Sequence, residues 1–276
     1  MNTIKLNEEQ LSCLKKIELE MLQEVDRICQ KHNLVYTLAY GSLLGAIRHK
    51  GFIPWDDDID IWMPREDYNR FKEICKTELN EKYFYQGNET DKEYFYLFDK
   101  LRANDTLFKE TFLSKYKIHH GVFLDIFPLD FIADKYKKKK KQYLLFHFYR
   151  TGLISKYVYT KARKGKKKVL AILLKLIYLF FPLRVLYKKA LKYATKYQHT
   201  PQAQYTDFAI TPGKIKDITL FPISYFEEII RVPFEDIEVN IPKNYDEILK
   251  KIYGDYMQLP PVEDRKTEHD LLEFKI

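Results

Sequence analysis

The sequence predicts an α+β fold, a mixed sheet flanked by helices with a helical insertion. Over about residues 1–132, short β-branched and aromatic runs bounded by Gly or Pro alternate with longer segments of helical period. From residue 134 to about 197, the pattern changes to lysine runs and apolar helical stretches. Strand patterns and one helix then return. We expect a single domain over 1–276, with a core at 1–133, an insertion at 134–200 and a C-terminal part at 201–276 that completes the core.

The elements of the core can be placed in order. The first is a helix, because Asn7 is a suitable N-cap and apolar residues recur at helical spacing from Leu11 to Ile28. Gly51 and Pro54 mark a loop before the next strand. The remaining predicted elements are strands at 34–40, 58–63, 94–102 and 121–129, helices at 43–48 and 64–79, and, in the tail, short strands around 232–242 and a helix at 244–253.

The composition indicates a folded protein whose partner carries phosphate. The 276 residues are 46% hydrophobic and 16% aromatic, with a net charge of +8 and a pI near 9.0. This charge favours a nucleotide, a nucleic acid or an anionic membrane as partner. Cys13, Cys29 and Cys75 form no CxxC pair, and the first residues lack a signal-peptide pattern. We therefore expect a cytoplasmic protein, at the inner face of the membrane if it binds lipid.

The insertion combines basic and apolar runs. "KYKKKKK" and "KARKGKKK" stand near "VLAILLKLIYLFFPLRVLY", which Lys175 and Pro182 interrupt. The uninterrupted parts are shorter than the roughly 20 residues that a membrane span needs. Two interpretations remain open: a helix buried under the sheet, or a basic apolar surface that rests on a membrane.

Four aspartates in five positions, Asp56, Asp57, Asp58 and Asp60, are the main candidate site. Two carboxylates about 4 Å apart repel by roughly 4 kcal/mol at an effective dielectric constant of about 20. Such a cluster therefore either spreads into water or holds a cation. Since residues two apart in a strand share a face, Asp58 and Asp60 should point the same way, with the isoleucines between and after them in the core.

Asp125, in "FLDIFP", extends this argument to another strand. Carboxylates from two strands can hold Mg²⁺ and leave room for water and a substrate phosphate. Asp58, Asp60 and Asp125 are therefore the predicted metal ligands and catalytic residues. Asp56 and Asp57 stand at the strand entrance and are expected to support the ligands or to be solvated, with Asp56 as a further ligand.

Gly41-Ser42 precedes the aspartates at the start of a predicted helix. A glycine lets the backbone approach a ligand closely, and the first N–H groups of a helix can bind phosphate oxygens. Basic residues that could neutralise phosphate lie nearby or two apart on a later strand: Arg48, His49, Lys50, Lys100 and Arg102.

Gly-Ser, then an apolar-flanked Asp-x-Asp, then a distant strand aspartate is similar to the pattern of the nucleotidyltransferase superfamily. The longer string "GSLLGAIRHKGFIPWDDDIDIWMPREDYNRF" resembles the LicD family, the bacterial phosphocholine transferases, and is similar to the fukutin-type transferases. "FDKLRANDT", "GVFLDIFPLD" and "IPKNYDEILKKIYGDYMQLPP" look like further blocks of the family. The resemblance covers residues 8–132 and 231–269, and its C-terminal block includes Tyr253, Asp255 and His269.

The resemblance implies a nucleotidyltransferase-like fold and a Mg²⁺-dependent transferase with one or two ions. It would move phosphocholine from CDP-choline to a sugar hydroxyl of a teichoic acid or another cell-surface glycan precursor, which could be lipid-linked. Either Asp125 or Asp56 would accept the proton of the acceptor. Trp55 would contact the choline or pack the loop onto the core. Tyr253, Asp255 and His269 would close the nucleotide pocket or seal the fold.

Three alternatives remain. The transferred group could be another CDP-linked group, ribitol phosphate or glycerol phosphate. The protein could be a true nucleotidyltransferase that leaves a nucleotide on its acceptor. It could also be a non-catalytic binder of nucleic acid or anionic membrane, which would leave the strand aspartates unexplained. We expect no nucleic-acid partner.

Overall fold

The computed structural model describes residues 3–157, 165–200, 202–210, 214–215, 218–267 and 269–276, and in this part of the chain two compact units can be distinguished. Unit 1 comprises Met1–Tyr94, Phe98–Leu129 and Phe221–Ile276. Unit 2 comprises Phe95–Leu97 and Asp130–Leu220. Most of the basic run "KARKGKKK" lies outside the described residues.

The sheet of unit 1 has the strand order β1-β2-β6-β4-β3. Strands β2 and β6 pair in parallel, while β1–β2, β6–β4 and β4–β3 are antiparallel. The sheet is therefore mixed, and the α+β class is confirmed. The strand bounds are β1 Thr37–Leu38, β2 Asp60–Pro64, β3 Tyr83–Gln86, β4 Asp99–Ala103 and β6 Phe123–Ile132.

The strand register aligns the predicted site residues. Asp60 is the partner of Asp125 in the β2–β6 pair, and Lys100 is the partner of Asp125 in the β6–β4 pair. Ile59 and Ile61 are completely buried, as the alternation predicted. Three neighbouring strands thus place two carboxylates and one ammonium group in a row.

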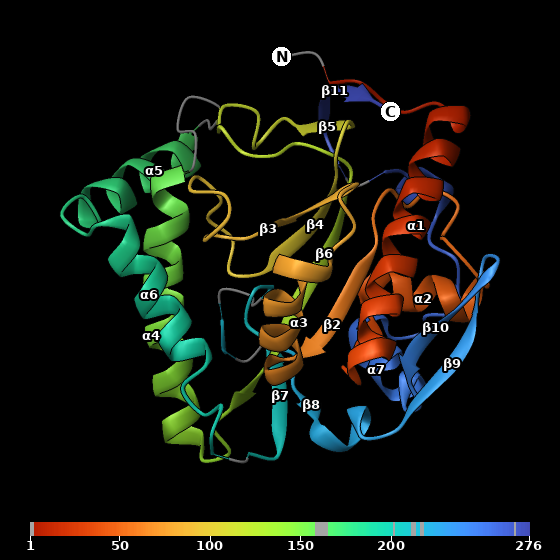
Figure 1. Ribbon diagram of the computed structural model, residues 1–276. Helices are drawn as coiled ribbons and strands as arrows, with labels where there is room; N and C mark the ends of the chain where they lie inside the picture. The colour runs from red at the N-terminus through yellow and green to blue at the C-terminus, as the bar shows by residue number, and fades with distance from the viewer. Residues whose placement is uncertain (1–2, 158–164, 201, 211–213, 216–217, 268) are drawn as a thin grey trace. The chain divides into compact units, whose positions relative to one another are not determined.

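Helices of unit 1 support this sheet. Helix α1, Glu8–His32, begins with the predicted Asn7 cap, which forms a capping box with Gln10. Helix α1 packs against α3, Arg65–Glu78, and helix α2, Tyr40–Arg48, packs against β1, β2 and α7, Tyr245–Tyr253 (Figure 1). The other elements of unit 1 are β5 Leu107–Glu110, β8 Phe221–Pro222, η3 Ile223–Phe226, β9 Ile229–Phe234, β10 Ile237–Pro242, η4 Val262–Asp264 and β11 Leu271–Lys275.

Unit 2 is mainly helical, as predicted for the insertion. Its helices are α4 Tyr136–Tyr157, α5 Gly165–Ile177 and α6 Leu183–Ala194, and its strand is β7 Gln204–Asp207. Helix α4 packs against α5 and α6. The core of the unit contains Ile132, Tyr143, Phe146, Ala190, Ala194 and Phe208.

The predicted elements differ from the observed ones in three respects. Only Thr37 and Leu38 of the predicted strand at 34–40 are paired, because helix α2 already begins at Tyr40. The strand predicted at 94–102 begins only at Asp99. Strands β3, β5, β7, β8 and β11 are not predicted from the sequence. Each has at most five residues; β3 pairs antiparallel with β4, and β5 and β11 pair antiparallel with each other in a separate sheet.

Candidate active site

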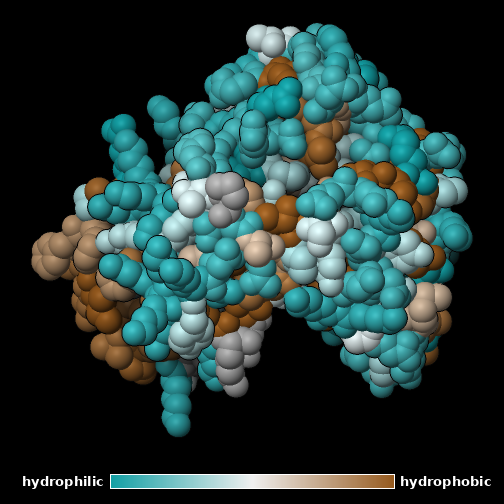
Figure 2. All heavy atoms as spheres, turned by 90° about the horizontal axis from the view of Figure 1, so that it is seen from below, coloured by the Kyte–Doolittle hydropathy of each residue, from teal (hydrophilic) through white to brown (hydrophobic). Residues whose placement is uncertain are grey.

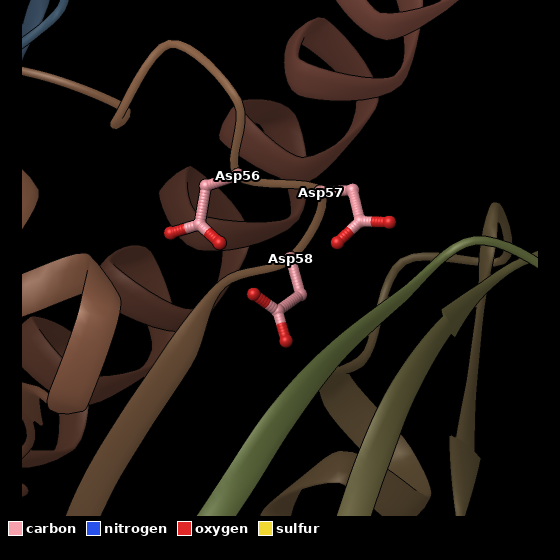
Figure 3. Close-up of side chains that lie close together, drawn as sticks. All are labelled: Asp56, Asp57 and Asp58. Carbon is pink, nitrogen blue, oxygen red and sulfur yellow. The ribbon is translucent and has the colours of Figure 1, made fainter. Parts of the chain in front are cut away.

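Three aspartates lie together on the segment that leads into β2. One carboxylate oxygen from each of Asp56, Asp57 and Asp58 lies within 4.8 Å of those from the other two. Figure 3 shows the three side chains gathered around this segment. Strand β2 begins only at Asp60, so Asp58 belongs to the approach to the strand. The predicted cluster is therefore real, and it is centred slightly before the strand.

Asp60 and Asp125 extend the cluster across the sheet. Asp125 is buried and forms an ion pair with Lys100, whose Nζ lies 2.5 Å from Oδ1. The same ammonium lies 3.5 Å from the centre of the Phe123 ring. Lys100 is thus held between a carboxylate and an aromatic face, where it offsets one negative charge of the site.

Burial and mutual repulsion change the acidity of these groups. The pKa of Asp58 is raised well above its usual value by burial and by the neighbouring Asp56. The pKa of Asp60 is also raised, by burial and then by Asp58 and Asp125. The pKa of Asp125 is raised by burial, although Lys100 opposes this shift. The cost of charging these carboxylates is what a bound cation would offset.

Asp57 has a different environment from the one expected. It is only 1% exposed, so it is not solvated. Its Oδ1 accepts a hydrogen bond from Nδ1 of His269 at 3.1 Å. Burial lowers the pKa of His269, but the bond to Asp57 and the charge of Asp58 outweigh it and raise the pKa to about 9. His269 therefore brings a positive charge from the C-terminal block to the aspartate cluster.

The Gly41-Ser42 pair lies in the first turn of α2 and touches the cluster. A Cβ atom on Gly41 would lie 2.9 Å from Oδ2 of Asp56, which explains the glycine. The Ser42 Oγ accepts a hydrogen bond from the backbone N–H of Asp60 at 2.9 Å. Ser42 thereby ties the start of β2 to the helix, and its hydroxyl proton can still be donated elsewhere.

A pocket of about 540 Å³ adjoins the cluster through Asp56. The side chain of Arg48 donates to the carbonyl of Tyr256 at 2.9 Å, which ties α2 to the segment after α7. The guanidinium of Arg265 lies 5.5 Å from the centre of the Trp55 ring, and His49 meets the same ring edge-on. Predicted site residues that line the pocket are Gly41, Arg48, Trp55, Asp56, Tyr253 and Asp255.

Two predicted phosphate-binding residues lie elsewhere. Lys50 lines a separate hollow with Lys15 and Glu235. Arg102 is completely buried, and its guanidinium donates to Gln86 and to the carbonyl of Gly121. Both Lys100 and Arg102 lie over the Phe123 ring, so the prediction that they share a face is confirmed.

Helix α1 contributes residues that the sequence analysis missed. Glu18 is 1% exposed, and its Oε2 has no hydrogen-bond partner. Its pKa is raised well above the usual value by burial and then by Asp58, Asp57 and Asp56. Lys15, one turn earlier, donates to the carbonyls of Ile53 and Pro54 and so fixes the loop before the cluster. The sequence does contain a sign that Glu18 is buried, because it lies between Leu14 and Met21 on the buried face of α1.

The residues present fit a magnesium ion. All the side chains of the cluster offer carboxylate oxygens, the ligands that Mg²⁺ prefers. The unpartnered buried Oε2 of Glu18 and the raised pKa values of Asp58 and Asp60 show that the negative charge is not fully compensated by protein groups. The carboxylate oxygens close enough to share one ion belong to Asp56, Asp57 and Asp58, whereas Asp60 and Asp125, two of the predicted ligands, lie beside this group on paired strands.

Comparison with known families assigns a class to the part of the chain that carries the aspartates. Residues 33–161 match the family described as LicD/FKTN/FKRP, nucleotidyltransferase domain. The matched segment contains the aspartate cluster, Asp125 and Lys100.

Similarity to a bacterial protein extends over nearly the whole chain. The sequence is 31% identical over 276 residues to the lipopolysaccharide cholinephosphotransferase LicD of Haemophilus influenzae, covering 98% of this chain and 97% of that protein. The chain belongs to the LicD family. Uncharacterized proteins of Rickettsia typhi and Rickettsia prowazekii are 40% and 38% identical to it over 55 residues, 20% of this chain and 18% and 21% of theirs.

Proposed function

We propose that this protein transfers phosphocholine from CDP-choline to a sugar hydroxyl of a cell-surface glycan precursor. The observation that carries the proposal is the place of Asp56, which belongs both to the carboxylate cluster and to the pocket wall. A nucleotide in this pocket would have its phosphates beside the carboxylates. The full-length similarity to a protein named as a lipopolysaccharide cholinephosphotransferase supports the choice of transferred group.

The pocket offers suitable chemistry for both ends of the donor. The ring of Trp55 already has a cation beside it, the guanidinium of Arg265, and a quaternary ammonium makes the same kind of contact. Helix α2 begins beside the cluster, since Gly41 in its first turn lies against Asp56, and the first N–H groups of a helix can bind phosphate oxygens. We place the phosphates at Gly41 and the choline at the aromatic residues Trp55 and Tyr253.

The reaction is a displacement at the phosphorus that carries choline. The acceptor oxygen forms a bond to this phosphorus, the bond to the bridging oxygen breaks, and CMP leaves with the electron pair. The acceptor proton passes to a carboxylate. Of the two candidates, Asp125 is bonded to Lys100 while Asp56 lines the pocket, so we assign the proton to Asp56.

When bound, Mg²⁺ would offset the negative charge that develops on the leaving group. Asp58, Asp60 and Asp125 would hold it in position. Lys100 fixes the orientation of Asp125 through the ion pair, and Ser42 fixes the start of β2. The acceptor would be a teichoic acid, lipopolysaccharide or similar glycan precursor.

A comparison of donors and products tests this proposal. Purified protein is incubated with Mg²⁺, a glycan acceptor and CDP-choline, CDP-ribitol or CDP-glycerol, and the products are analysed by mass spectrometry. We expect release of CMP and a gain of phosphocholine on the acceptor with CDP-choline alone. A gain of CMP on the acceptor would indicate a true nucleotidyltransferase. If ribitol phosphate or glycerol phosphate is transferred in preference to phosphocholine, that group is the one the protein transfers.

A further inference from the structure

Positive charge in this chain is concentrated in one segment. Residues 135–206 contain 20 lysine and arginine residues and no aspartate or glutamate. The remaining residues contain 27 basic and 39 acidic residues, so they carry a net negative charge while the whole chain carries +8. The basic pI is therefore a property of unit 2 alone. A phosphate-bearing donor bound in unit 1 does not explain it.

Helix α5 in this segment exposes apolar side chains to solvent. Only Ala171 among its apolar residues is buried. Just after the helix, Tyr178 is buried and its hydroxyl donates to the carbonyl of Phe148 on α4, whereas the side chain of Phe180 is 89% exposed. The expectation of a buried helix is therefore wrong for α5. Exposed apolar residues in and after α5 are Val169, Leu170, Ile172, Leu173, Leu176, Ile177, Leu179 and Phe180, which we call the apolar face.

Basic residues flank the apolar face along the chain. Figure 2 shows hydrophobic side chains gathered at the left of the view, with hydrophilic side chains projecting beside them. Lys166 and Lys168 precede the face on α5, and Arg184 follows it at the start of α6. Monomeric soluble proteins rarely expose large contiguous apolar patches. Some partner with apolar and anionic groups would cover this one.

We propose that the apolar face and its lysines bind the surface of an anionic lipid bilayer. Lipid acyl chains would take up the leucines and Phe180, and the phosphate headgroups would meet the lysines. None of the described helices has the length and apolar character that a membrane crossing requires. Helix α5 has 13 residues and carries Lys175 within it, so it would lie in the interface rather than span it.

Charge distinguishes this partner from the alternatives. A second copy of the chain would bring two strongly positive segments together, which repel each other. A nucleic acid would pair with the lysines but would leave the apolar face exposed. Only a surface that is anionic outside and apolar below it matches both features. This proposal concerns unit 2 and does not depend on the transferase activity.

Vesicle flotation tests the proposal. The full-length protein is mixed with vesicles of phosphatidylcholine alone or of phosphatidylcholine with phosphatidylglycerol, at low and high salt. We expect flotation with the anionic vesicles at low salt. The double variant Leu176→Gln/Phe180→Gln should reduce the partition coefficient by at least about tenfold, because both side chains are more than half exposed and their loss removes apolar contacts with lipid.

Lysine variants provide a matched control. Lys166→Gln with Lys168→Gln should weaken binding by about thirtyfold, since each lysine near the membrane contributes about fivefold. Lys82→Gln with Lys117→Gln makes the same change in net charge in unit 1, at two exposed positions, and should have little effect. Equal losses in the two pairs would overturn the proposal, because attraction would then depend on net charge alone.

A fluorescent reporter tests insertion directly. The two native tryptophans, Trp55 and Trp62, both lie in unit 1, so Phe180→Trp adds a reporter to the apolar face. Anionic vesicles should shift the emission of this variant to shorter wavelength. The proposal would be overturned by an absence of flotation at low salt. It would also be overturned by a dimer in light scattering that the Leu176→Gln/Phe180→Gln variant dissociates, or by binding of a DNA duplex without binding of vesicles.

Discussion

Asp58 and Asp60 are the residues whose charges matter most for the proposed reaction. Changing either to Asn keeps the shape and removes the charge of a proposed metal ligand, a contribution worth several kcal/mol in the transition state. We expect the rate of CMP release from CDP-choline to fall by on the order of a thousandfold. The melting temperature should hold or rise, since one repulsion is lost.

Asp57→Asn is the matched control for these variants. Its carboxylate bonds His269, and an Asn can still accept that hydrogen bond. We expect a tenfold loss of activity at most, by the scale of about 1.4 kcal/mol per factor of ten. Equal loss in Asp57→Asn and Asp60→Asn would contradict the assignment of ligands. Loss of activity in Asp60→Asn only through unfolding would make the cluster structural.

Glu18 should destabilise the metal-free protein. Burial and the three aspartates raise the pKa of Glu18 in the folded protein. The protein therefore has its full stability when this carboxyl is protonated, below the pKa of the unfolded chain, and loses stability as the pH rises through the pKa of the folded protein. Glu18→Gln in EDTA should therefore increase the free energy of unfolding by about 1–3 kcal/mol, more at about pH 8 than at about pH 5. Urea denaturation at both pH values measures this. A uniform decrease would show that the carboxylate is needed structurally.

His269 should make the stability of the protein fall at alkaline pH. Because its folded pKa is raised to about 9, its contribution to stability is present below about pH 6.5 and is lost as pH rises through about 9. The shift corresponds to about 3 kcal/mol. We expect the wild type in EDTA to lose stability between neutral pH and pH 10, and His269→Gln to lose about that much less. Parallel profiles for the two proteins would refute this role.

At the scale of elements, Gly45 sets how closely α2 approaches the following loop. A Cβ atom there would lie 2.5 Å from the carbonyl oxygen of Gly51, a contact that backbone can relieve only by moving. Gly45→Ala should reduce stability by about 2–4 kcal/mol in chemical denaturation. Gly254→Ala, with open space but a φ of 70° and a ψ of −120°, should cost about 1–3 kcal/mol through backbone strain alone. If Gly45→Ala leaves the free energy of unfolding unchanged, the loop at Gly51 can shift to accommodate the methyl group.

The sequence predicts the elements whose pattern is local. The capping box at Asn7, the alternation around Ile59 and Ile61, and helix α7 all follow from neighbours along the chain. Strands β5 and β11 do not, because each is stabilised by a partner more than 150 residues away. Helix α5 left two interpretations open because an apolar run has the same sequence whether it faces a core or solvent.

The same distinction applies to the site. Asp60 and Asp125 are predicted to lie on strands from the alternation of residues and do pair in neighbouring strands, whereas Asp58 is predicted on the same strand as Asp60 and lies before it. The bond between Asp57 and His269 joins residues 212 positions apart, which no local pattern reveals. The cation beside Trp55 comes from Arg265, which has no motif of its own. Only the fold shows such pairs.

At the scale of the whole molecule, binding of the donor should increase the stability of the folded protein. A nucleotide bound to the folded state alone stabilises it by about 2.7 kcal/mol at a hundred times its Kd. We expect CDP-choline to raise the melting temperature by several degrees with Mg²⁺ and not in EDTA, because carboxylates repel the donor phosphates when no cation is present. An equal shift in EDTA would exclude a metal-dependent nucleotide site. CMP and choline, tested separately, identify which part of the donor binds.

The discontinuity of unit 1 has a consequence for the order of events during translation. The chain leaves this unit after Leu129 and returns to it at Phe221. His269 and strand β11 must leave the ribosome before Asp57 and strand β5 can acquire their partners. The lysine-rich segment is synthesised earlier, while the catalytic unit is still incomplete. A nascent chain could therefore be attracted to an anionic surface before it is able to catalyse anything, so that targeting would precede activity in each molecule.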